Sequence, residues 1–158
     1  MLKMDILRRR LNDAIPWVKR NPDQLDTRIR KGNIVASGRP GASFEYRYHL
    51  DVLVMDFPND IDMLTLAILT WARDHQPDLI FNPDKRVREI SFDADILDNG
   101  NADVLFSLPV SEAVTVTQDS NGNIKFKPHD EPDYRDLYGI GEGVWTINFD
   151  GTMTDDGL

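Results

Sequence analysis

The strongest constraint on the fold is a run of alternating residues from position 44 to position 55. Apolar and aromatic residues occupy every second position, and the positions between them hold charged residues or histidine as far as Asp51. This period of two is typical of a β-strand, in which successive side chains point to opposite faces of a sheet. At Leu53 and Met55 the second face also becomes apolar. We therefore predict a long strand that is buried on one face throughout and covered on both faces in its second half.

A strongly apolar helix is predicted directly after this strand. Asn59 or Asp60 is suited to cap its first turn, and apolar residues then surround almost the whole helix as far as Trp71. The helix ends by Gln76, because Pro77 disfavours the helical conformation of the residue before it. A helix that is apolar nearly all round needs cover on more than one side. We expect a sheet to cover one side and another subunit to cover the other.

The N-terminal region combines a helix with a shorter strand. Apolar residues at helical spacing predict a helix over residues 2–20. Pro16 must kink or restart this helix, because proline lacks the backbone N–H and clashes with the preceding turn. An Asn-Pro pair at 21–22 fits a second helix start. Residues 29–36 are predicted to form a strand that Gly32 interrupts.

Two Asn-Gly pairs, at 99–100 and 121–122, lie between runs of alternating residues. Asn-Gly between such runs is the strongest short-range signal for a β-hairpin, because both turn residues tolerate positive φ. The four predicted strands of these hairpins cover residues 90–97, 102–108, 110–117 and 124–127.

Together these elements predict an α+β fold. An N-terminal helix and a central apolar helix pack on a mixed, mainly antiparallel sheet of about four to six strands. We assign residues 1–127 to one domain. Residues 128–158 form an acidic tail that contains glycine and proline, in which residues 144–149 are predicted to form a short strand. This tail is either partly disordered or an arm whose strand adds to the sheet edge of a neighbouring molecule.

Charge and composition exclude several classes of function. The net charge is -9, with about +6 in residues 1–40 and about -15 in the remainder. A predominantly acidic chain repels nucleic acid, so we expect no sequence-specific nucleic-acid partner. The chain has no cysteine and no apolar stretch long enough for a membrane span. Its first residues do not resemble a signal peptide, so we expect a protein that is made and used in a cytoplasm, without a membrane partner.

No pattern of catalytic or metal-binding residues emerges. No two of the three histidines have the close spacing of ligands on one helix face. Asp93, Asp95, Asp98 and Asp103 lack the glycine and glutamate positions of a calcium-binding loop. On a strand, Asp93 and Asp95 share a solvated face opposite Phe92 and Ala94, which we expect to be buried. We therefore predict no catalytic residue, no cofactor and no bound metal.

Several short motifs resemble the tail-completion R protein family of contractile-tailed temperate bacteriophages. The resemblance covers roughly residues 1–118 and rests on specific matches that are spread along the chain. These matches are residues 43–48 (Ser-Phe-Glu-Tyr-Arg-Tyr), residues 56–57 (Asp-Phe), Trp71, residues 76–79 (Gln-Pro-Asp-Leu), Phe92 and residues 95–97 (Asp-Ile-Leu).

The resemblance implies a structural virion protein and not an enzyme. It implies a role at the head-proximal end of a phage tail, where the protein ends tube and sheath polymerisation and prepares head joining. The implied partners are copies of the same chain in a ring, with a hexamer as one form, together with tail tube, sheath and other tail- and head-completion proteins. The implied location is the virion tail, after assembly in the cytoplasm of a bacterial host.

The basic N-terminal region and the apolar central helix supply the candidate contacts between subunits. A basic third and an acidic remainder suit head-to-tail packing, which closes into a ring when the rotation per subunit divides a full turn. Two other functions remain as alternatives, namely a small cytoplasmic hydrolase that uses carboxylates and an unrelated protein-interaction module. The candidate interface residues are Arg8, Arg9, Arg10, Leu66, Leu69 and Trp71.

Overall fold

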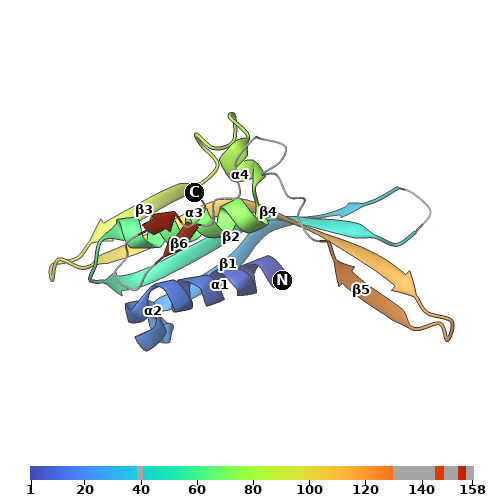
Figure 1. The fold of residues 1–158 in the computed structure, drawn as a ribbon, viewed down its shortest axis with the longest axis horizontal. Coiled ribbons are helices and arrows are strands. Elements are labelled where there is room, and N and C mark those ends of the chain that lie inside the picture. The colour runs from blue at the N-terminus through green and yellow to red at the C-terminus, as the bar shows by residue number, and fades with distance from the viewer. Residues whose placement is uncertain (39–40, 130–144, 148–152, 156–158) are drawn as a thin grey trace.

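A five-stranded antiparallel sheet forms the framework of the molecule (Figure 1). Its strand order is β1-β2-β4-β3, and β5 pairs with the far end of β4. The predicted α+β class and the antiparallel pairing are thus confirmed. The strands are β1 (Leu25–Ala36), β2 (Phe44–Phe57), β3 (Ser91–Ile96), β4 (Ala102–Gln118) and β5 (Ile124–Pro128). This computed structural model describes residues 1–38, 41–129, 145–147 and 153–155.

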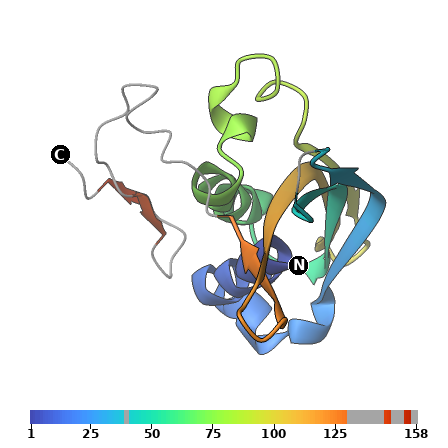
Figure 2. The same ribbon diagram turned by 90° about the vertical axis from the view of Figure 1, so that its right-hand side faces the viewer.

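Helices cover one face of this sheet, as the end-on view in Figure 2 shows. We call this face the helix-side face and the opposite one the open face. The predicted effect of Pro16 is confirmed, because α1 ends at Ala14 and α2 begins at Pro16. The Asn-Pro pair at 21–22 introduces a single 3-10 turn. The helices are α1 (Leu2–Ala14), α2 (Pro16–Arg20), the 3-10 helix η1 (Pro22–Gln24), α3 (Ile61–His75) and α4 (Asp78–Phe81).

The core lies between the sheet and helices α1 and α3. Alternate residues of β2, from Tyr48 to Val54, are buried on the helix-side face, as the period of two predicted. Leu7 and Leu11 of α1 and Leu64 of α3 are fully buried against them. Helix α1 of the same chain packs against α3 and covers part of its second side. The expectation that another subunit also covers α3 stays a prediction.

Strand β4 is longer than predicted, because it continues through Pro109 where we expected two separate strands. Ser111 directs its N–H away from β2, to the side chain of Gln76. Pro109, two residues earlier, faces the same edge. Strand β3 extends along β4 only as far as Ser107 and does not reach Pro109. Since no neighbouring strand needs an N–H from residue 109, proline is tolerated inside a 17-residue strand.

Two irregularities shape the central strands. The predicted interruption at Gly32 is a shift of register between Arg30 and Asn33, where Lys31 has φ +53°. A second shift in β2 leaves Asp56 with φ +54°. The Asp56 carboxylate accepts hydrogen bonds from Asn99 and Asn101, so this bulge holds the β3–β4 turn.

The C-terminal region contributes a separate two-stranded sheet. Strand β6 (Trp145–Ile147) lies within the strand expected at 144–149 and pairs antiparallel with β7 (Met153–Asp155). Most of the predicted tail at 128–158 lies outside the described residues. The boundary between domain and tail therefore stays a prediction.

Candidate interaction surface

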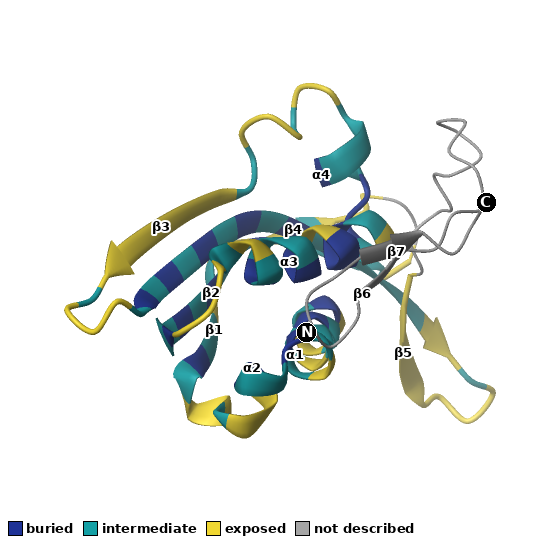
Figure 3. Ribbon diagram, turned by 60° about the vertical axis from the view of Figure 1, so that its left-hand side comes forward, coloured by how far each residue is buried: buried dark blue, intermediate teal, exposed yellow. Residues whose placement is uncertain are grey.

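Strand β3 is an exposed edge of the sheet (Figure 3). All six of its residues are exposed, including Phe92 at 63% and Ile96 at 70%. Our expectation that Phe92 and Ala94 are buried was therefore wrong. Phe106, the partner of Phe92 on β4, is only 3% exposed. The helices thus cover the helix-side face as far as β4 but not β3, and the apolar side chains of β3 are left exposed to solvent.

The two faces of β3 differ in chemistry. Residues that pair across strands share a face, so Phe92 and Ala94 lie on the helix-side face with Phe106 and Val104. Asp93 and Asp95 alternate with them and lie on the open face. The edge thus presents an apolar row on one side and two carboxylates on the other.

A shallow apolar groove adjoins the apolar row of β3. Its volume is about 410 Å³, and helices α3 and α4 form one wall while β3 and β4 form the other. Leu69 on α3 is 38% exposed at this position. The apolar residues that line the groove are Leu69, Leu79, Ile80, Ile90, Phe92 and Phe106.

Another exposed edge is the hairpin of residues 114–128, which we call the β4–β5 arm. It projects from the far end of β4, as Figure 1 shows. Every residue of β5 is exposed, with Phe126 at 65%. Phe126 pairs with Val116 and so shares the helix-side face with Ile124, whereas Lys125 and Lys127 lie on the open face. The arm therefore repeats the alternation of β3 with the opposite charge.

The turn of the arm is held by Asp119. Its Oδ1 accepts the backbone N–H groups of Asn121 and Asn123, each at 2.9 Å. The N–H of Asn123 is the main cause that lowers the pKa of the Asp119 carboxyl below its ordinary value. This predicted Asn-Gly hairpin is confirmed, with Gly122 at φ +83°.

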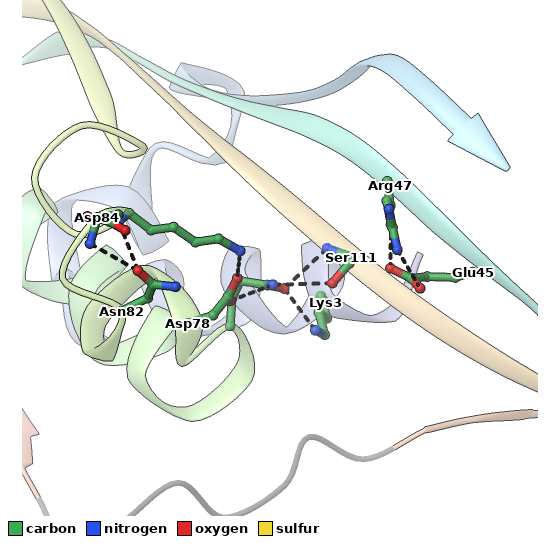
Figure 4. Close-up of polar contacts among 9 residues, drawn as sticks. Lys3, Glu45, Arg47, Asp78, Asn82, Asp84 and Ser111 are labelled. Atoms are coloured by element: carbon green, nitrogen blue, oxygen red, sulfur yellow. Dashed lines mark hydrogen bonds and ion pairs between the residues drawn. The ribbon is translucent and has the colours of Figure 1, made fainter. Parts of the chain in front are cut away.

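Between β3 and the arm, the side chain of Gln76 binds Ser111 at the edge of β4, and Figure 4 labels its partners Ser111, Lys3 and Asp78. Its Oε1 accepts the backbone N–H of Ser111 at 3.2 Å and the ammonium group of Lys3 at 2.9 Å. Its Nε2 donates to Asp78 at 2.8 Å. The Ser111 N–H, in the part of β4 between β3 and β5, thus has an acceptor within the chain, whereas no described strand lies along the outer edge of β3 or β5.

A buried polar cluster ties α1 to the sheet beside this position. Glu112 of β4 accepts the backbone N–H of Lys3 at 2.9 Å and the hydroxyl of Tyr48 at 2.6 Å. Trp71 donates its indole N–H to the carbonyl of Lys3 at 3.1 Å. Burial, together with the hydrogen bond to Glu112, raises the pKa of the Tyr48 hydroxyl, which therefore stays protonated. This cluster is structural, since each polar group meets another within the chain.

Charged groups on the open face also pair with one another. Asp51 of β2 accepts hydrogen bonds from Arg30 of β1 and Ser107 of β4. Burial opposes ionisation of Asp51, but the bonds from Arg30 and Ser107 outweigh that effect and hold its pKa below the ordinary value of an aspartate. This cluster links three strands across the sheet.

A polar hollow of about 470 Å³ lies beside the edge of β4, and four of the charged residues that line it form two ion pairs. Arg47 meets Glu45 at 2.8 Å, and Lys85 meets Asp78 (Figure 4). Within the part of the chain that the structure describes, no group of acidic residues or histidines is placed to hold a metal ion. No helix among the described residues is long and apolar enough to cross a membrane.

The structure separates the three candidate arginines of α1. Arg8 donates to the Thr27 hydroxyl at 2.8 Å, and Arg10 forms an ion pair with Asp74 at 3.0 Å. Arg9 is exposed and makes no hydrogen bond or ion pair with the residues of the chain that are described. Arg8 and Arg10 thus have roles within one chain, and Arg9 points to solvent.

The three apolar candidates of α3 also differ. Trp71 is 0% exposed and lies in the core of its own chain. Leu66 is half-buried, and Leu69 borders the apolar groove beside β3. Of these, only Leu69 adjoins the exposed row of Phe92. The role of all six candidates in an interface stays a prediction.

Sequence reasoning found both hairpins but missed that their outer strands are open. An amphipathic alternation indicates one apolar face and cannot indicate whether a helix extends over it. One signal was present, because Lys125 and Lys127 on one strand and Asp93 and Asp95 on another carry charges of a single sign. Charged edge strands are typical of sheets whose edges are exposed.

The chain was compared with known proteins. The family model described as P2 phage tail completion protein R (GpR) matches residues 1–132. A curated relative, tail completion protein R of Escherichia phage P2, is 37% identical over 150 residues, which cover 91% of this chain and 97% of that protein. No solved structure matches the chain. The match spans the whole main sheet and its helices, and the chain belongs to the P2 phage tail completion protein R family.

Proposed function

We propose that this protein is a structural component of a phage tail that completes its head-proximal end. Membership of the tail completion protein R family is the observation that carries this proposal. In this role the protein ends polymerisation of the tail tube and sheath and prepares the tail for joining to a head. It acts through contacts between proteins and not through catalysis.

The surface of the described chain supports a role in assembly. Strands β3 and β5 offer open backbone edges with apolar rows, which suit the addition of a strand from another protein. In the polar hollow, Arg47 pairs with Glu45 and Lys85 pairs with Asp78. The carboxylates of β3 lie on an exposed strand and not in a cleft, so no observation favours the alternative of a hydrolase.

The partners follow from this role. Copies of the chain form a ring, and a hexamer is one form that such a ring takes. The ring meets the last layer of tail tube and sheath on one side and head-completion proteins on the other. Assembly takes place in the cytoplasm of the bacterial host, and the protein remains in the virion tail.

Deletion of the gene from the phage that encodes it tests this function. We expect lysates that contain heads and tails in separate form, with tails of irregular length, because polymerisation lacks its stop. Electron microscopy of the lysate measures both features. Expression of the wild-type chain in trans serves as the control and restores joined particles. Normal virions in the absence of the gene would contradict the proposal.

A further inference from the structure

We infer that copies of this chain join by strand addition, in which β5 of one copy pairs with the outer edge of β3 in the next copy. The inference rests on the proposed assembly into a ring and names the contact that builds it. The occupant of both open edges is therefore a second copy of this chain. The residues that carry the contact are Phe92, Asp93, Asp95, Lys125, Phe126 and Lys127.

Among the residues that the structure describes, both strands leave one edge unpaired. Strand β3 pairs only with residues 102–107 of β4, and β5 pairs only with residues 114–118. An exposed edge with an apolar row is a template for pairing with another chain. Such an edge is either shielded from other chains or paired with a partner strand. Strands β3 and β5 are similar in length to each other and to an average strand, so one can pair along the whole of the other.

The two open edges cannot meet within one molecule. Strand β2 pairs with both Ser107 and Val114, so β3 and β5 lie on the same, opposite edge of β4. They are separated there by residues 108–113, which span about 20 Å along the strand. Gln76 occupies this interval through its bond to Ser111. Because neither edge has a partner among the described residues, we assign its partner to another molecule.

The alternation of the two strands matches face by face. In a joined sheet, Phe92, Ala94 and Ile96 share the helix-side face with Ile124 and Phe126 of the neighbour, as within each copy. Apolar pairs across strands stabilise a sheet and remove the exposed rows from water. This match holds for either strand direction, because the period is two in both.

The charges select this pairing over its alternatives. On the open face, Asp93 and Asp95 of one copy meet Lys125 and Lys127 of the next. A β3–β3 contact would place aspartates opposite aspartates, and a β5–β5 contact would place lysines opposite lysines. Like charges directly opposite one another destabilise a sheet, whereas opposite charges stabilise it. The favoured contact is thus head-to-tail, which is the type that generates closed rings.

The joined sheet also fixes the orientation of each copy. Because the apolar rows share one face, the helices of all copies lie on the same side of the joined sheet. The apolar groove at Leu69 and Ile80 then lies next to the seam, where Phe126 of the neighbour extends the apolar surface. The open face, which carries Asp51 and the acidic pair of β3, forms the other side of the ring.

A charge-exchange series in the full-length protein tests the contact. One variant carries Lys125→Glu and Lys127→Glu, a second carries Asp93→Lys and Asp95→Lys, and a third combines all four changes. Sedimentation of the purified proteins measures association, and circular dichroism checks folding. We expect each double variant to associate at least about tenfold more weakly, because two cross-strand charge pairs become repulsive. The combined variant has the net charge of the wild type and is expected to associate like it.

A matched control separates a local contact from overall charge. Lys19→Glu with Arg20→Glu makes the same charge change on α2, where both residues are exposed. We expect this control to associate like the wild type. The pairing would be overturned if the folded double variants assembled normally or if the folded combined variant did not assemble. It would also be overturned if the control associated as weakly as the arm variant or if the wild type stayed monomeric. Any of these results leaves the tail role open, because the gene deletion tests that role separately.

Discussion

At the residue scale, a few buried polar side chains decide how the helices sit on the sheet. Glu112 is the clearest case, because it holds both the start of α1 and the aromatic ring of Tyr48. Gln76 has a similar role at the edge of β4, where it satisfies Ser111 and Lys3. Hydrophobic burial supplies most of the stability of such a core, and these bonds fix the position of one layer on the other.

The replacement Glu112→Ala is expected to destabilise the fold. It leaves the Tyr48 hydroxyl and the Lys3 amide without their acceptor, at a cost of about 1–3 kcal/mol for each buried donor left unpaired. Urea unfolding followed by circular dichroism measures the change in free energy. Glu45→Ala is the matched control, since its partner Arg47 is exposed, and we expect a change within about 0.5 kcal/mol. Equal effects of the two replacements would contradict the role of Glu112.

Asp51 is expected to make the fold sensitive to acid. The pKa of the Asp51 carboxyl is lower in the folded state than in the unfolded state. Its contribution to stability is therefore present at pH values above its pKa in the unfolded chain, and it is lost as the pH falls toward its pKa in the folded protein. The variant Asp51→Asn should therefore lose less stability than the wild type between about pH 5 and pH 3. Ser107→Ala removes one of the two donors and should give an intermediate slope. Thermal unfolding across this pH range measures all three, and identical slopes would contradict the prediction.

At the element scale, local signals in the sequence predicted most of the secondary structure. The alternation in β2, the two Asn-Gly turns and the break at Pro16 each act over a few residues, and each appears in the structure. Features that depend on distant packing were missed. The burial expected for Phe92 depends on how far α3 extends sideways, and the cover of α3 by α1 depends on the tertiary arrangement. For the same reason, Trp71 could be named as a candidate interface residue from the sequence, whereas the structure places it in the core.

Engineered cysteines provide a prediction about the contact between β3 and β5. The natural chain has no cysteine, so any disulfide must join the introduced residues. We expect a mixture of Ala94→Cys and Phe126→Cys chains to form a mixed disulfide dimer, because both positions lie on the helix-side face and opposed Cα atoms lie within about 4.4–6.8 Å. A gel without reductant measures the dimer.

Asp95→Cys mixed with Phe126→Cys is the matched control for this experiment. These two positions lie on opposite faces of the joined sheet, so their side chains point apart and little dimer should form. Equal yields from the two mixtures would argue for random collision and against strand addition.

At the scale of the whole molecule, the chain is built as a unit of assembly. One face of the sheet carries its helices, Gln76 binds Ser111 at the edge of β4, and β3 and β5, toward opposite ends of β4, have outer edges that no described strand covers. Opposite charges on those ends favour an ordered, head-to-tail arrangement over random aggregation. This arrangement suits the ring that we propose at the end of the tail.

The position of the protein in the virion is the sharpest test of its role in tail completion. Full-length chain with an epitope tag, produced in place of the natural copy, can be located on purified tails by gold-labelled antibody and electron microscopy. If the protein completes the head-proximal end, we expect one cluster of label on each tail, at the end that joins the head. Label along the tube, label at the opposite end, or purified tails without any label would contradict it.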